Sequence, residues 1–295
     1  MEFRTIVDIP ESPWKIEPCE RMLFIGSCFA DNIGKRFTEE KFRAVVNPYG
    51  VMYNPASILH TVRRLTQDDA MPFSPDEQGT AVMTLGTNHV YILKETGEIV
   101  DNCQKRPQRL FEERELSITE CAAYLDKAIQ LISHRFPKTR FILTVSPIRY
   151  RKYGYHESQL SKATLMLAID SLVKAQTSTP GGHSTTVDAQ RITYFPSFEI
   201  INDELRDYRF YKPDMLHPSD QAVDYIFERM ASTYFSDATT AFLKEWKPTR
   251  EALNHRPLHP ESEEYRLFRI KTEERLKQLE DKYNGRPQGP QPANH

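Results

Sequence analysis

A histidine and a carboxylate three residues apart stand out among the residues that could do chemistry. Asp214 and His217 lie in a turn-like segment that Pro218 follows directly. At this spacing a turn can bring the carboxylate to the imidazole Nδ1–H, which orients the ring for general-base catalysis. Because a proline disfavours helical geometry at the preceding residue, we expect His217 to lie at the rim of the next helix. The pair predicts the base of a nucleophilic site.

A candidate nucleophile lies much earlier in the chain, at Ser27 or Cys28, directly after a short apolar run that ends at Gly26. Both residues join a predicted strand to a predicted helix, whose first N–H groups and dipole favour negative charge. Acyl transfer needs a nucleophile, a base, an orienting carboxylate and donors for the oxyanion. These residues therefore predict acyl transfer. A plainer interpretation makes Cys28 a small buried residue that closes the strand–helix corner.

Three further residues follow predicted strands and are candidates for substrate binding: Arg149, His89 and His156. Arg149 could clamp an anionic substrate group or form a salt bridge at the rim of the site. The stretch 149–156 mixes basic and aromatic side chains, as single-strand nucleic-acid binders do. Because the net charge is −2 and only one such stretch exists, we expect a mobile lid over a pocket instead. The three histidines 89, 156 and 217 lack the spacing of metal ligands.

Alternating strands and helices must position these residues. Apolar runs predict strands at 21–25, 44–46, 82–85, 141–145 and 192–195, with a β-ribbon at 89–94 that turns at 95–98. Apolar spacing predicts helices at 31–42, 55–66, 118–136, 158–175 and 219–234. This alternation, with fully apolar central strands, predicts a doubly wound α/β domain with helices on both faces of a parallel sheet. Its site is expected at the C-terminal ends of the strands.

The composition excludes several classes of protein. The 295 residues include 39 Lys and Arg and 41 Asp and Glu, so we do not expect nucleic-acid binding. No apolar run approaches the ~18 residues of a membrane span, and the N-terminus has no apolar core of a signal peptide, so we expect a cytoplasmic protein. The four cysteines form no CxxC pair and are expected to be free thiols. No phosphate loop or dinucleotide fingerprint is present, and we expect no cofactor.

The stretch Gly26-Ser27-Cys28-Phe29-Ala30 resembles the motif that gives the GSCFA family its name. That family is grouped with the SGNH, or GDSL-like, esterases and lipases. Further stretches that resemble the family are residues 47–55, 84–87, 161–162 and 214–218. The resemblance implies a flavodoxin-like three-layer sheet, with strand order 2-1-3-4-5 and a hydrolase-type site.

The resemblance also implies roles for individual residues. When the stretch is laid on the Gly-Asp-Ser-Leu block of SGNH proteins, Cys28 matches the nucleophilic serine, and Ser27 remains the alternative nucleophile. Gly50 matches the backbone donor to the oxyanion, and Asn88 matches the side-chain donor. His89 stands where the third block usually has Asp, and this departure affects the contacts that would hold Asn88.

We therefore expect a hydrolase of esters or thioesters, or an acyltransferase, that works through a covalent acyl-enzyme. By analogy with relatives of this fold, the substrate is a small molecule or an acylated carbohydrate. The alternative is a non-catalytic binding protein that keeps an SGNH-type pocket, which the altered third block favours. The oligomeric state stays open.

The chain divides into three predicted parts. An SGNH-like GSCFA domain spans residues 1–236, a charged helical extension spans 237–283, and a tail rich in Pro, Gly and Gln spans 284–295. The helix predicted at 261–283 has few apolar positions, and we expect it to dock on the domain or to lie in solvent. The tail is expected to be disordered.

Overall fold

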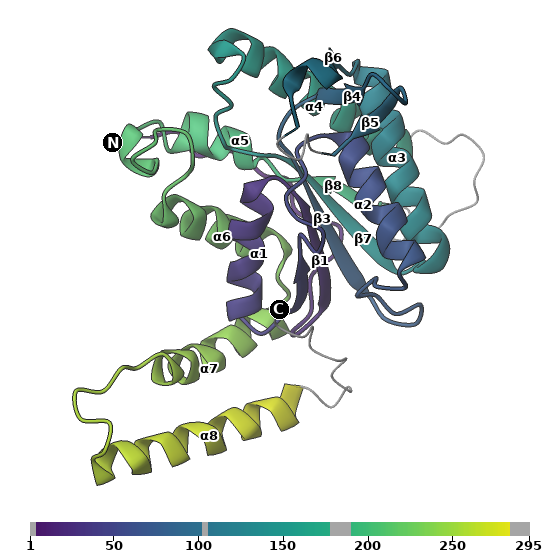
Figure 1. Ribbon diagram of the computed structural model, residues 1–295. Coiled ribbons are helices and arrows are strands. Elements are labelled where there is room, and N and C mark those ends of the chain that lie inside the picture. Colours follow the sequence, from purple (N-terminus) through teal and green to yellow (C-terminus); the bar gives the residue numbers. More distant parts are fainter. Residues whose placement is uncertain (1–3, 102–105, 178–189, 284–295) are drawn as a thin grey trace.

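The computed structural model describes residues 4–101, 106–177 and 190–283 (Figure 1). Cys103, most of the loop expected at 177–183 and the tail expected to be disordered lie outside these ranges. The described part is a mixed α/β fold with a mostly parallel central sheet, as predicted, followed by a C-terminal helical segment.

The central sheet has five strands, all parallel to their neighbours, in the order β2-β1-β3-β7-β8. This is the expected 2-1-3-4-5 order of the parallel strands. Their bounds are β1 (Arg21–Gly26), β2 (Arg43–Val46), β3 (Gly79–Leu85), β7 (Thr139–Val145) and β8 (Ile192–Tyr194). The register places Gly26 beside Thr84, and Thr84 beside Thr144. The C-terminal ends of the three middle strands therefore meet at one edge.

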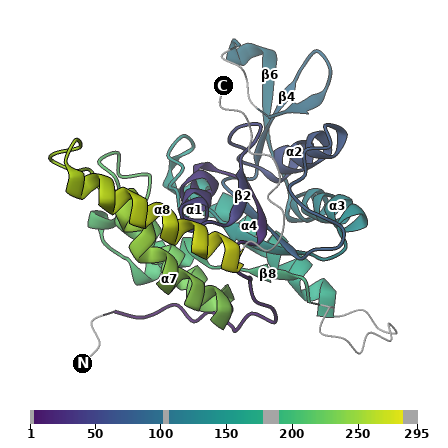
Figure 2. The same cartoon turned by 90° about the horizontal axis from the view of Figure 1, so that it is seen from below.

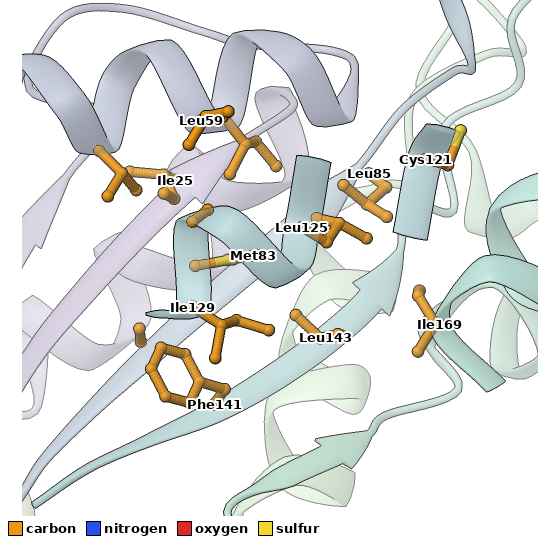
Figure 3. Close-up of a cluster of buried hydrophobic side chains, with 14 of the residues drawn as sticks. Ile25, Leu59, Met83, Leu85, Cys121, Leu125, Ile129, Phe141, Leu143 and Ile169 are labelled. Atoms are coloured by element: carbon orange, nitrogen blue, oxygen red, sulfur yellow. The ribbon is translucent and has the colours of Figure 1, made fainter. Parts of the chain in front are cut away.

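Helices cover both faces of this sheet because its strands are apolar on both sides. In β1, Leu23 and Ile25 pack into one core with α2 (Pro55–Gln67), α3 (Ile118–Arg135) and α4 (Gly154–Thr177). Figure 3 shows part of this core, where side chains of β3, β7 and α3 interdigitate. Met22 and Phe24 point into the second core, against α1 (Cys28–Glu39) and α6 (Asp220–Tyr234).

Two helices begin earlier than their apolar spacing predicts. Helix α1 begins at Cys28 rather than at 31, because the Ser27 side chain accepts a hydrogen bond from the Phe29 N–H and caps the helix. Helix α4 begins at Gly154 rather than at 158. The earlier start of α1 places Cys28 within the first turn of a helix.

A small antiparallel sheet extends from the C-terminal edge of the central one. It has the order β5-β4-β6 and consists of β4 (His89–Leu93), β5 (Glu98–Val100) and β6 (Phe111–Glu115). The expected ribbon is confirmed as β4 and β5. Strand β6 was not predicted, because its sequence FEERE has one apolar residue among charged ones. Short helical turns lie at Gln108–Leu110 (η1), Ser197–Glu199 (α5), Ile200–Glu204 (η3) and Tyr208–Phe210 (η4).

The C-terminal segment is a pair of helices that docks on the far end of α1 (Figure 2). Helix α8 (Glu263–Tyr283) was predicted as a separate helix, whereas α7 (Asp237–Leu253), which contains Pro248, lies in the predicted helical extension without having been placed there as a separate helix. Trp246 packs against Leu279, and its indole N–H donates to Glu39 O at 3.0 Å. Among the helices of the described ranges, none combines the length and the apolar character needed to span a membrane.

Candidate active site

The turn after β1 is built on a glycine that no other residue could replace without strain. Gly26 has a φ of +137°, and a Cβ at this position would lie 2.1 Å from Thr84 O. The Gly26 N–H donates to Asn47 Oδ1 at 2.9 Å, while Asn47 Nδ2 donates to Asp31 Oδ1 at 2.6 Å. Asn47 therefore ties the end of β1 to the first turn of α1.

Ser27 is buried, and its backbone N–H and its hydroxyl both form hydrogen bonds within the protein. Its N–H donates to Thr84 O and Thr84 Oγ1, and its hydroxyl lies 3.1 Å from Thr84 Oγ1 while accepting from the Phe29 N–H. Only 1% of the residue is exposed. A hydroxyl in this position caps a helix and has little access to a substrate.

Cys28, the next residue, is partly exposed at the first position of α1. Its Sγ lies 3.7 Å from the hydroxyl of Tyr53. Burial, and then this hydrogen bond, raise the pKa of Tyr53 to about 12, so the phenol keeps its proton and can donate it to a thiolate. Within the described part of the chain, no protein group accepts the Cys28 N–H. This N–H is therefore open to a developing oxyanion.

The other described cysteines are poor nucleophiles. Cys19 and Cys121 are buried free thiols. Burial raises the pKa of Cys19, and it raises the pKa of Cys121 to about 12. Since only the thiolate attacks, Cys28 is the one thiol among the three with both access and a favourable position.

The segment after β2 does not supply the oxyanion donor predicted from it. Gly50 has a φ of +90°, and its N–H donates to Asn47 O at 2.8 Å. That donor is therefore engaged within its own turn, which corrects the expectation for Gly50. The segment serves the site through Tyr53 instead, whose carbonyl accepts from the N–H groups of Gly86 and Thr87 at 2.8 and 2.9 Å.

Asn88 and His89, the residue before β4 and the first residue of β4, are both buried rather than exposed at an open surface. The Asn88 side chain is 2% exposed and donates to Leu116 O at 2.9 Å, and its backbone N–H donates to Ser161 Oγ. These contacts tie Asn88 to Leu116 and to Ser161 of α4. A role of Asn88 as a donor to the oxyanion stays a prediction. His89 is also buried and stacks on the Tyr153 ring at 3.8 Å, and burial lowers the pKa of its imidazole.

Asp214 and His217 form the pair that their spacing predicts. His217 Nδ1 lies 2.6 Å from Asp214 Oδ2, while Asp214 Oδ1 accepts from the backbone N–H groups of His217 and Leu216. These backbone bonds, and then the ring contact, lower the pKa of Asp214 to about 2. The carboxylate is therefore charged at neutral pH and holds the imidazole with Nε2 turned away from it.

Arg149 binds the turn that carries His217. Its backbone N–H donates to Leu216 O at 3.0 Å, and its guanidinium donates to Met215 O at 3.1 Å. Within the described ranges it forms no ion pair, so the expected rim salt bridge is absent. Its guanidinium lies over the rings of Tyr155, Tyr208 and Tyr211 instead.

The stretch 149–156 packs against the small sheet. Lys152 forms an ion pair with Glu113 at 3.1 Å, and the Tyr153 hydroxyl lies 3.2 Å from that of Tyr91. His156 is exposed in the first turn of α4. Motion of this stretch as a lid, and substrate contact by His156, stay predictions.

The candidate nucleophile and base lie at the same edge of the sheet but do not touch. Cys28 follows β1, and the His217 turn is held by the segment that follows β7. Within the described ranges, the Cys28 thiol bonds to Tyr53 and the His217 ring bonds to Asp214, with no hydrogen bond between them. Catalytic hydrogen bonds are often longer before substrate binds.

The sequence did not predict that the side chain of Lys162 is buried at this edge of the sheet. It is 1% exposed, and its ammonium donates to Gly86 O at 2.7 Å and to Ser146 O at 2.8 Å. Burial lowers the pKa of Lys162 to about 7. The side chain thereby ties the end of β3 to the end of β7. The only signal in the sequence is its place beside Ser161 in a stretch that resembles the family.

Comparisons with known proteins agree with the stretches described above. The model of the GSCFA family matches residues 21–77 and 74–230, and the model of the GSCFA C-terminal domain matches residues 246–286. No curated protein matches the chain. A solved structure from Streptococcus pneumonia, described as a "putative platelet activating factor", is 16% identical, covers 73% of this chain and 84% of its own, and has a TM-score of 0.43.

The buried ammonium predicts a pH-dependent stability. The folded pKa of Lys162, about 7, lies below the value near 10.4 of an unfolded chain. Between these values the unfolded state binds more protons, so the free energy of unfolding rises with pH by at most about 1.4 kcal/mol per pH unit. We expect urea unfolding from pH 7 to 9 to show this gain for the wild type relative to Lys162→Met.

An exposed lysine provides the control for this measurement. Lys35 lies on α1 with its side chain 68% exposed, so Lys35→Met should give a pH profile parallel to that of the wild type. A Lys162→Met profile that also runs parallel would contradict the lowered pKa of the buried ammonium.

Proposed function

The chain belongs to the GSCFA family, and we propose that it is an SGNH-type hydrolase of esters or thioesters, or an acyltransferase, in which Cys28 forms the acyl-enzyme. The observation that carries the proposal is that two neighbouring residues, Ser27 and Cys28, lie in different environments. The Ser27 hydroxyl is buried in the cap of α1, whereas the Cys28 thiol is accessible at the positive end of the same helix.

The proposed reaction begins with proton transfer from the Cys28 thiol to His217 Nε2. The thiolate then attacks the substrate carbonyl carbon and forms a C–S bond, while the carbonyl π electrons move to the oxygen. The free Cys28 N–H and the dipole of α1 stabilise this oxyanion. When the C–O or C–S bond to the leaving group breaks, His217 returns the proton to that group.

Deacylation follows the same path with water, or with an acceptor hydroxyl in a transferase. His217 takes a proton from the incoming oxygen, which attacks the thioester carbonyl, and the C–S bond breaks. The Cys28 thiolate that leaves then takes the proton from His217, which restores the thiol and the neutral imidazole. Asp214 keeps its charge throughout and orients the imidazole through Nδ1. Substrate binding must bring Cys28 and His217 within hydrogen-bond reach.

The arrangement of the sheet supports the SGNH-type assignment. The parallel order β2-β1-β3-β7-β8 places the turn after β1 beside the end of β3, and the segment after β7 holds the His217 turn. Residues from the two ends of the chain thus converge at the C-terminal edge, where open α/β sheets bind their ligands. An acylated carbohydrate remains the substrate suggested by analogy.

The second candidate function is a binding protein that keeps this pocket without catalysis. It is favoured by three departures from the SGNH pattern, two at the predicted oxyanion donors and one at the residue beside Asn88. The Gly50 N–H is engaged in its turn, Asn88 donates to Leu116 O, and His89 stands in place of Asp. Turnover of p-nitrophenyl acetate or a short acyl thioester would decide for the enzyme, and its absence together with retained ligand binding would decide for the binding protein.

The nucleophile assignment predicts opposite effects at two adjacent positions. Cys28→Ala should abolish turnover, whereas Ser27→Ala should keep most of it and lose about 0.5–2 kcal/mol of stability with the helix cap. Iodoacetamide should modify Cys28 before the buried Cys19 and Cys121, as read by peptide mass mapping. If Ser27→Ala stays folded but is inactive, and a fluorophosphonate labels Ser27 in the wild type, the assignment is reversed.

The base assignment predicts a large loss of rate without a loss of fold. His217→Ala should lower kcat by about 10²–10⁴-fold and slow the labelling of Cys28, because the thiol loses its proton acceptor. Asp214→Asn should have a similar or smaller effect, through a wrongly oriented imidazole. His134→Ala, a change at an exposed position of α3, is the matched control. Full activity of His217→Ala would exclude this residue as the base.

A further inference from the structure

A pocket of about 260 Å³ is lined by Arg149, which holds the His217 turn, and the pocket has no part in the reaction steps above. Its floor is apolar, since Phe198 and Ile201 are buried there. Its polar lining includes the guanidinium groups of Arg149 and Arg206 and the hydroxyl of Ser158. The wall that it shares with the candidate active site is Arg149, which holds the carbonyls of Met215 and Leu216.

The lining of this pocket carries two positive side chains, Arg149 and Arg206, and one negative side chain, Asp207. Within the described ranges, neither Arg149 nor Arg206 forms an ion pair. The carboxylate at the rim, Asp207, is already paired with Arg209 at 2.9 Å. Arg149 donates to one carbonyl oxygen and so keeps further N–H groups for a ligand. The 24-residue helix α4 supplies Tyr155 from its first turn and Ser158 from the next residue position beyond that turn, and the dipole of α4 adds positive potential.

Three tyrosine rings hold the Arg149 guanidinium in place. It lies 4.5 Å from the ring centre of Tyr155, 5.5 Å from that of Tyr211 and 5.6 Å from that of Tyr208. Stacking on rings leaves the edge of a guanidinium free for planar, two-pronged contact with an oxyanion. A preorganised arginine over an apolar floor suits a short carbon chain that ends in a negative group.

We infer that this pocket binds an oxyanion of the substrate, a carboxylate or a phosphate on its acyl or its leaving part. That this anion belongs to a substrate rests on the proposed function. Binding of the anion in the pocket does not depend on catalysis by Cys28. Arg206 and Arg149 neutralise the charge, Ser158 adds a hydroxyl donor, and Phe198 and Ile201 contact the carbon chain. The pocket therefore selects anionic esters or thioesters over neutral ones.

Binding without catalysis tests the pocket independently of the enzyme proposal. Full-length Cys28→Ala protein is titrated in a calorimeter with glutarate, with inorganic phosphate, and with glutaramide as the neutral counterpart of glutarate. We expect glutarate or phosphate to bind and glutaramide not to bind, and we expect affinity to fall as salt is added. The anion that binds more tightly identifies which of the two groups the pocket takes. Absence of binding by both anions would overturn the inference.

Arg206 is the position to vary, because Arg149 also supports the His217 turn. Arg206→Gln, added to Cys28→Ala, should weaken anion binding by about tenfold through loss of a charge-assisted contact. Arg63→Gln removes the same charge from the exposed face of α2 and should leave affinity unchanged. Equal affinities in both variants, or equal losses in both, would place the anion outside this pocket.

Turnover by protein with Cys28 intact gives a second measurement. The ratio of kcat/KM for a p-nitrophenyl hemiglutarate ester to that for the neutral valerate ester should fall by about tenfold in Arg206→Gln, with the valerate rate preserved. If neither ester is hydrolysed while glutarate still binds, the hydrolase proposal fails and the anion pocket stands. If the ratio is unchanged in Arg206→Gln, the pocket does not select the substrate.

Discussion

One buried ammonium connects the halves of this candidate site. Lys162 reaches from α4 to the carbonyls of Gly86 and Ser146, the residues that directly follow β3 and β7, and supplies donors to oxygen atoms at the strand ends. Gly86, at one end of this bridge, donates to the carbonyl of Tyr53, whose hydroxyl meets Cys28. The other end, Ser146, lies three residues before Arg149, which holds the His217 turn. The candidate nucleophile and the candidate base thus depend on the same interaction.

The burial of the Lys162 ammonium costs free energy, and the contacts that offset this cost join the strand ends to their surroundings. Burial of an ammonium without a carboxylate is unfavourable, as the lowered pKa of Lys162 shows. Two carbonyl contacts offset part of that cost. The ammonium nitrogen also lies over the Phe198 ring, 5.8 Å from its centre. The same ring forms the floor of the anion pocket. Strand ends, candidate active site and pocket are therefore one packed unit.

The sequence predicted the parts of the fold that apolar patterns specify. The five strands of the central sheet and the helices 55–67, 118–135 and 220–234 follow such patterns closely. It did not predict β6, because four of the five residues of that strand are charged. It also did not place α7, which contains Pro248, as a separate helix. At the site, the Asp214–His217 pair was predictable because it is local. The burial of Lys162 and the engagement of the Gly50 N–H arise from tertiary packing and from a turn, which spacing alone does not specify.

The five residues from Gly26 to Ala30 show why a short motif can specify a site. Gly26 allows the backbone to pass within contact of Thr84. Ser27 caps the helix, Cys28 occupies its first turn, and Phe29 and Ala30 are fully buried in the core beneath. Because each residue has a different physical task, a shift of one position would bury the thiol and expose the cap. The order of these residues, and not only their presence, therefore places a partly exposed thiol at the helix N-terminus.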